Sequence, residues 1–77
     1  MAAIHSTDVL ALLGTTVDLV EAVPMPCGPE SRRYRARVMA VQMPAPGTGI
    51  ECSLLLLEEG LPPDCMDYVE LDRLQLA

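Results

Sequence analysis

Four basic side chains form the most distinctive chemical group in the sequence: Arg32, Arg33, Arg35 and Arg37. Side chains alternate between the two faces of an extended strand, so Arg33, Arg35 and Arg37 fall on one face. Guanidinium groups pair bidentately with carboxylates and phosphates. This face is therefore a candidate site for a small anionic ligand, an acidic peptide or a nucleic-acid backbone. The alternative is that these arginines pair within the chain, with Glu51, Glu58, Glu59 and the acidic residues of the last strand.

Four acidic side chains surround the second proline-bearing loop: Asp64, Asp67, Glu70 and Asp72. Such a group is suited to a basic protein partner, or to imitating a nucleic-acid backbone. The alternative is a solvated rim without a partner. Both charged groups are retained as candidate binding residues.

No spacing in the sequence indicates catalysis, a cofactor or a metal. His5, the only histidine, lies in an N-terminal segment, residues 1–5, that we expect to fray, so it is a poor general base. Three cysteines without Cys-x-x-Cys spacing, Cys27, Cys52 and Cys65, indicate free thiols rather than a zinc site or a secreted disulfide scaffold. We therefore expect a protein that is not an enzyme.

Charge restricts the partners. The net charge is −6, and all five basic residues are arginine. An acidic chain repels phosphate, which disfavours general nucleic-acid binding and membrane surfaces. No apolar run approaches the roughly 20 residues of a membrane-spanning helix, and the N-terminus lacks the pattern of a secretory signal. A cytoplasmic location is the expectation.

Composition predicts one small domain with an aliphatic core. The 77 residues are 51% hydrophobic but include no Phe, no Trp and only two Tyr. A domain of this size buries a modest fraction of its surface, and leftover apolar surface often marks an interface. We therefore expect a protein partner, and a homodimer or higher oligomer is one way to cover that surface.

The predicted elements begin with a short helix. Ser6, Thr7 and Asp8 offer N-cap oxygens before an apolar run at 9–13, and Gly14 follows as a C-terminal cap, so Val9, Leu10 and Leu13 would dock on the sheet. Residues 15–23 are β-branched and apolar and predict a strand. Residues 24–31 contain three prolines and predict a loop.

The centre of the chain predicts a β-hairpin. Strands are expected at 33–43 and 50–59, joined by a turn of proline and glycine at 44–49. Simple register pairs Met43 with Ile50, Met39 with Leu54 and Arg35 with Glu58. The run 54–57 is apolar on both faces, which indicates a strand covered on both sides.

The remaining segments predict a loop at 60–66, a strand at 67–70, a kink at 71–74 and a short last strand. An N-terminal helix, four to five antiparallel strands and the closing segment 69–74 resemble the SH3-like and Sm-like barrels. The expected fold is therefore mainly β with one short N-terminal helix, in a small curled antiparallel barrel. The alternative is an open four-stranded antiparallel sheet with one packed helix.

Two functions follow from these patterns. The first is a small, acidic, non-catalytic protein-interaction module, with regulation or inhibition of its partner as the outcome. The second is a binder of a small anionic ligand or nucleic acid through the face of Arg33, Arg35 and Arg37. The two differ in their response to salt, because phosphate binding weakens steeply as salt increases.

Overall fold

The computed structural model describes residues 2–77. In chain order the elements are β1 (Ala2–Ala3), α1 (Val9–Leu12), β2 (Thr16–Val23), β3 (Glu30–Gln42), β4 (Ser53–Glu58), the 3-10 turn η1 (Pro63–Cys65), β5 (Asp67–Glu70), the 3-10 turn η2 (Leu71–Arg73) and β6 (Leu74–Leu76). The expected mainly β chain with one short N-terminal helix is confirmed.

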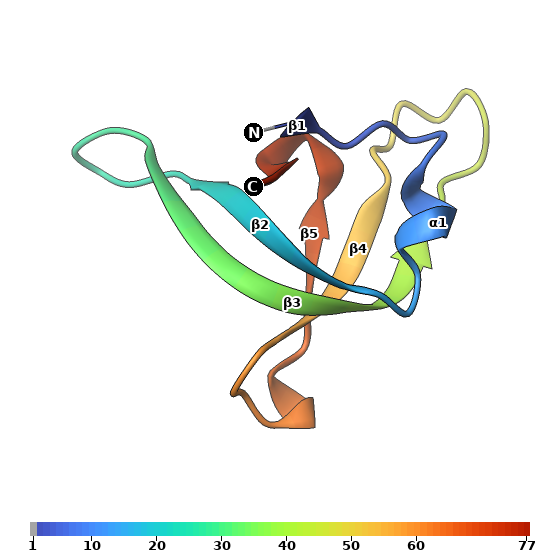
Figure 1. Ribbon diagram of the computed structural model, residues 1–77. Helices are drawn as coiled ribbons and strands as arrows, with labels where there is room; N and C mark the ends of the chain where they lie inside the picture. Colours follow the sequence, from blue (N-terminus) through green and yellow to red (C-terminus); the bar gives the residue numbers. More distant parts are fainter. Residues whose placement is uncertain (1) are drawn as a thin grey trace.

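The six strands form one antiparallel sheet in the order β1-β6-β2-β3-β4-β5. The sheet curls strongly, with β2 and β3 sweeping under β4 and β5 (Figure 1). It does not close, because β1 and β5 are its two edges, so the predicted closed barrel is not confirmed. The alternative of four strands is wrong in number, because β1 and β6 extend the sheet beyond β2. The predicted short last strand is confirmed as β6, whereas β1 was not predicted.

The N-terminal segment differs from the prediction in two ways. Ala2 and Ala3, in the stretch expected to fray, pair with β6. Asp8 precedes α1 but makes no side-chain capping hydrogen bond. Gly14 follows the helix at φ 81° as expected, and its amide donates to Val38 in β3 at 2.8 Å. This left-handed residue turns the chain directly from the helix into β2.

The helix docks with a different face from the one predicted. Val9 is fully buried in the core and Leu12 packs against it, whereas Leu10 and Leu13 are exposed. A helix of four residues has room for one buried stripe, and here the stripe contains Val9 and Leu12. The helix therefore covers the core side of the sheet.

The central hairpin has a different register from the predicted one. Leu54 pairs with Val41 instead of Met39, and Glu58 pairs with Ala36 instead of Arg35. The cause is the connection: residues 50–52 lie outside β4, so the connection is longer than the predicted 44–49 and Gln42 pairs with Ser53. A β-bulge between Val38 and Ala40 then adds a residue to β3 and reduces the departure from two positions at Leu54 to one at Glu58.

Thr48 accounts for part of that longer connection. Its hydroxyl donates to the Ala45 carbonyl at 2.8 Å and accepts from the Ile50 amide at 3.4 Å. These two bonds hold a compact turn and direct the Ile50 amide away from the strand ladder. The Pro-rich joint therefore uses more residues than a simple hairpin turn.

The bulge changes which residues of β3 are buried. Before it, Ala36 and Val38 are fully buried, and beyond it Val41 packs against the same core. The core also contains Val9, Leu19, Cys52, Leu54, Leu56, Val69, Leu71 and Leu74. We call the side of the sheet that carries this core the inner face and the opposite side the outer face.

Candidate functional site

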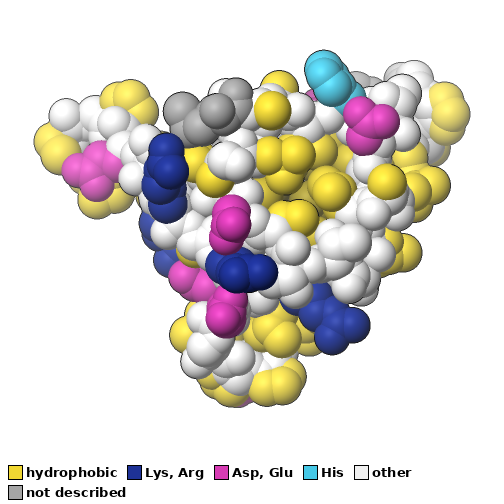
Figure 2. Space-filling view, in the orientation of Figure 1, with side chains coloured by type: hydrophobic (Ala, Val, Ile, Leu, Met, Phe, Trp, Pro, Cys, Tyr) yellow, Lys and Arg dark blue, Asp and Glu magenta, His cyan; other side chains and the backbone are white. Residues whose placement is uncertain are grey.

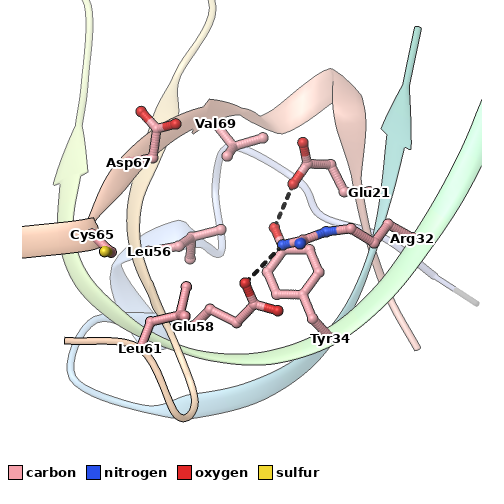
Figure 3. A pocket seen from close by; sticks show the side chains of 9 residues that line it. All are labelled: Glu21, Arg32, Tyr34, Leu56, Glu58, Leu61, Cys65, Asp67 and Val69. Carbon is pink, nitrogen blue, oxygen red and sulfur yellow. Dashed lines mark hydrogen bonds and ion pairs between the residues drawn. The ribbon is translucent and has the colours of Figure 1, made fainter. Parts of the chain in front are cut away.

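The inner face continues past the core into a cleft of about 240 Å³. We call it the inner cleft, and Figure 3 shows its nine lining side chains: Glu21, Arg32, Tyr34, Leu56, Glu58, Leu61, Cys65, Asp67 and Val69. Polar residues of β2 and β3 form one wall, and the floor is apolar. Two carboxylates, Glu21 and Glu58, converge on the centre, whereas Asp67 lies at the far rim (Figure 3).

A charged network occupies the inner cleft. The guanidinium of Arg32 lies 4.3 Å from the centroid of the Tyr34 ring and donates to Glu58 at 3.0 Å. Tyr34 donates its hydroxyl to Glu21 at 2.7 Å, and the second oxygen of Glu21 accepts from Arg73 at 2.8 Å. Tyr34 therefore takes part in a chain of charge-assisted contacts through one ring face and its hydroxyl.

The network raises the pKa values of two of its members, Tyr34 and Arg32. Burial, followed by the hydrogen bond to Glu21, raises the pKa of Tyr34 above its ordinary value of 10.0. The hydrogen bond to Glu58 raises the pKa of the Arg32 guanidinium. Tyr34 is therefore a neutral donor and Arg32 a full positive charge throughout the physiological range.

The strand register explains why these residues meet. Glu21 pairs with Arg32, and Leu19 with Tyr34, across β2 and β3. Alternation along each strand then points Glu21, Arg32 and Tyr34 to the inner face. The predicted arginine cluster contains Arg32, but this site was not predicted. Alternation along the strand places Arg32 and Tyr34 on one face and the other three arginines of the cluster on the opposite face. This pattern is visible in the sequence and could have indicated the site.

The outer face carries an apolar strip over β3, β4 and β5. Ala40 pairs with Leu55, and Leu55 pairs with Tyr68, so one row crosses all three strands. Leu57 lies two residues further along β4 on the same face. Leu55 and Leu57 are half-buried, and Tyr68 is 52% exposed. We call Ala40, Leu55, Leu57 and Tyr68 the outer strip.

The predicted arginine face lies beside the outer strip. Arg33, Arg35 and Arg37 are all exposed and project to the outer face, as alternation requires. Arg35 approaches Glu59 at 3.6 Å and Asp18 at 3.9 Å. Within the described part of the chain, no carboxylate forms an ion pair with Arg33 or Arg37. Intrachain pairing therefore occupies one of the three.

The four predicted acidic residues are not brought together. Asp64 lies in η1 and Asp72 in η2, at opposite ends of β5. Asp67 and Glu70 project to opposite faces of β5, Asp67 into the rim of the inner cleft and Glu70 beside Tyr68. Their carboxylates therefore form no common rim.

The described surface has mixed character. Acidic and basic side chains alternate on the left half of Figure 2, and hydrophobic side chains reach the surface in its upper right half. Among residues 2–77, no group of three His, Cys, Asp or Glu side chains is arranged to hold a metal ion. Cys27 and Cys65 are exposed free thiols and Cys52 is a buried one. No helix described is long and apolar enough to cross a membrane.

Comparison of the chain with protein-family models, with curated proteins and with solved structures gave no match. The chemical character of two surfaces, the inner cleft and the outer face, is what indicates function in this chain.

Proposed function

We propose that this chain is a small, acidic, non-catalytic protein-interaction module, and that the outer strip is its self-association surface. The observation that carries the proposal is the outer strip itself. Leu55 and Leu57 alternate with the buried Leu54 and Leu56 and remain partly exposed on the face of the sheet opposite the core. Helix α1 lies on the inner face, where Val9 enters the core. Apolar surface of this kind is typical of an interface.

Charge complementarity favours a second copy of the chain as the occupant. Arg37 pairs with Leu57 in the sheet, and Glu70 pairs with Ser53. Because Leu55 lies midway between Ser53 and Leu57 on β4, the two charges flank the outer strip diagonally. Neither charge forms an ion pair within residues 2–77.

A two-fold axis in the plane of the interface satisfies both charges. If the axis passes through Leu55 and is perpendicular to the line from Arg37 to Glu70, Arg37 of each copy faces Glu70 of the other. The same operation stacks the two outer strips, which removes apolar surface from water. Such an arrangement packs two sheets face to face, as in β-sandwiches.

The remaining surface of the dimer is available to a protein partner. In each copy the inner cleft lies on the opposite face of the sheet from the proposed contact. The fold is part of this proposal: η2 returns β6 to the side of β2, so that β2 to β6 resemble an SH3-like barrel that has not closed. Small curled sheets of this kind support many binding functions, which their surfaces decide.

Two leucine substitutions test the self-association. We expect Leu55→Glu to give a folded monomer, because the charge enters the contact between copies. We expect Leu56→Glu to unfold the chain, because Leu56 is 4% exposed and the charge would be buried unpaired. Size-exclusion chromatography with light scattering measures the oligomeric state, and circular dichroism measures the fold. Leu10→Glu, on the exposed face of α1, is the matched control and should leave the dimer intact.

Charge reversal tests the proposed geometry separately. Arg37→Glu and Glu70→Arg alone should each weaken the dimer, and the double variant should restore it. A native chain that is monomeric at high micromolar concentration, with Leu55→Glu merely less stable, would refute self-association. A dimer that the double variant does not restore would refute the pairing of Arg37 with Glu70.

A second candidate function is supported by a hollow beside the arginine face. Arg35, Arg37, Thr16 and Leu57 line part of a depression of about 440 Å³ on the outer face. Glu58 and Glu59 also line the depression and Arg35 pairs with Glu59, so Arg37 is the guanidinium that an anion would meet there. Titration with inorganic phosphate, followed by amide chemical shifts, tests this function. Shifts confined to the hollow and lost in Arg37→Ala would support it, and unchanged spectra at low salt would exclude it.

A further inference from the structure

The inner cleft contains a cation held over an aromatic ring, and this cation belongs to the chain itself. Arg32 lies over the face of Tyr34 at 4.3 Å and is bound by Glu58 at 3.0 Å. An aromatic face with a carboxylate beside it is a general receptor for a guanidinium or an ammonium group. We propose that the inner cleft is a binding site for a basic side chain of a protein partner, and that Arg32 occupies it in the free chain.

The charge of the cleft favours a cation over an anion. Its lining includes three carboxylates, Glu21, Glu58 and Asp67, and Arg32 as the single base. Arg73 neutralises one oxygen of Glu21 from outside the lining. When Arg32 swings out, the carboxylates outnumber the remaining base and the ring of Tyr34 is exposed. The vacated cleft is then negative and has an aromatic wall.

Arg32 is placed so that it can leave. Half of its side chain is exposed, at 52%, and its contacts are one ion pair and one ring face. Exposed ion pairs contribute little to stability, and so do exposed cation–π contacts. Tyr34 is held more firmly, because its hydroxyl bonds to Glu21, which Arg73 fixes in turn. The receptor is therefore rigid, whereas its internal occupant is loosely held.

This inference rests on the proposed protein-binding function and names the chemistry of the partner. It uses the inner face, whereas self-association uses the outer face. The two are therefore separable: a chain that dimerises through Leu55 but binds no basic side chain retains the proposed function and overturns this inference.

The experiment removes the internal cation and measures binding of an external one. The probe is the blocked peptide Gly-Arg-Gly, with Gly-Lys-Gly as a second probe and Gly-citrulline-Gly as the neutral isostere. All variants carry Tyr68→Phe, which leaves Tyr34 as the only tyrosine, since the chain has two. The ring signals of Tyr34 in NMR titrations then report the inner cleft alone.

We expect Arg32→Ala to bind Gly-Arg-Gly about fivefold more tightly than the parent, because no internal ion pair or ring contact must be broken. Arg33→Ala is the matched control: it removes the same charge one residue away, on the outer face, and should bind like the parent. Adding Glu58→Gln to Arg32→Ala should remove the gain. Circular dichroism verifies that each variant is folded.

Three results would overturn the proposal. The first is equal affinity of Arg32→Ala and Arg33→Ala for Gly-Arg-Gly, which would show that the gain comes only from the change in net charge. The second is weaker binding by Arg32→Ala than by the parent, which would make Arg32 a contributor to ligand binding. The third is equal binding of the citrulline peptide, which would show that charge is not recognised. Binding of the lysine probe as well as the arginine probe would support the proposal, because both are basic side chains.

Discussion

Leu54 provides the sharpest test of the core. Its side chain is fully buried on the inner face of β4, between Val41 and Val69 in the strand register. Replacing it with alanine forfeits about 2–2.5 kcal/mol of transfer free energy. The cavity left behind raises the expected loss in the free energy of unfolding to about 3–4 kcal/mol.

That loss is large for this chain. A domain of 77 residues, at about 0.05–0.15 kcal/mol per residue, has a total stability of about 4–12 kcal/mol. With a urea m-value of about 1 kcal/mol/M, the unfolding midpoint should fall by about 3 M. The assay is urea denaturation followed by circular dichroism, at one protein concentration, because a dimer links stability to concentration.

Leu10→Ala is the matched control for Leu54→Ala. The chemical change is identical, but Leu10 is 62% exposed on α1. Alanine also has the higher helix propensity, so stability should change by less than about 0.5 kcal/mol. A loss below about 1.5 kcal/mol for Leu54→Ala, or equal losses for the two variants, would refute the assignment of Leu54 to the inner face.

Three further predictions concern the network and the helix end. In Tyr68→Phe, absorbance at alkaline pH should show that Tyr34 ionises above pH 10, because the pKa of Tyr34 is raised in the folded chain. The stability that Tyr34 contributes is then complete below about pH 10 and is lost as the pH rises further. Ionisation of Tyr34 near pH 10 in the folded chain would contradict this prediction. Arg73→Ala should lower the free energy of unfolding by about 1–2 kcal/mol, because it removes the hydrogen bonds from Arg73 to Glu21 and to the Ala22 carbonyl. An unchanged urea midpoint would show that these two hydrogen bonds do not stabilise the fold. Gly14→Ala should lower the free energy of unfolding by about 1 kcal/mol, because Gly14 has a left-handed φ of 81° that alanine adopts only with strain, even though the space around it is open. Thermal denaturation measures this loss, and an unchanged stability would show that the backbone relaxes at this position.

Local patterns in the sequence predict local structure well here. The start of α1, the glycine cap, the strands β2 to β5 and the kink at η2 all follow from residue types. Alternation also places Arg33, Arg35 and Arg37 on a common face. These features depend on neighbours within a few residues, which a sequence displays directly.

Long-range pairing was not predictable in the same way. The pairing of Leu54 with Val41 depends on where the long connection ends, and the bulge after Val38 changes the register again between Leu55 and Leu56. The pairing of β1 with β6 joins the two ends of the chain, through only two residues of β1. Whether a curled sheet closes depends on such distant contacts, so the barrel could not be distinguished from an open sheet.

The candidate site also combines a local pattern with long-range pairing. Arg32 and Tyr34 lie on one face because side chains alternate along a strand, and this alternation can be read from the sequence. Glu21 joins them only through the register of β2 and β3, and Glu58 only through the register of β3 and β4. The site therefore appears once the sheet is assembled.

The lengths of the two edge strands limit how this sheet can grow. β1 contributes two residues and β5 four, so few backbone amides and carbonyls are free to recruit another strand (Figure 1). Asp67 and Glu70 add negative charge to both ends of β5, where a second copy would meet like charge. Fibre formation by strand addition is therefore disfavoured despite the apolar composition. The self-association proposed for the outer face differs from strand addition, because a two-fold contact stops at two copies.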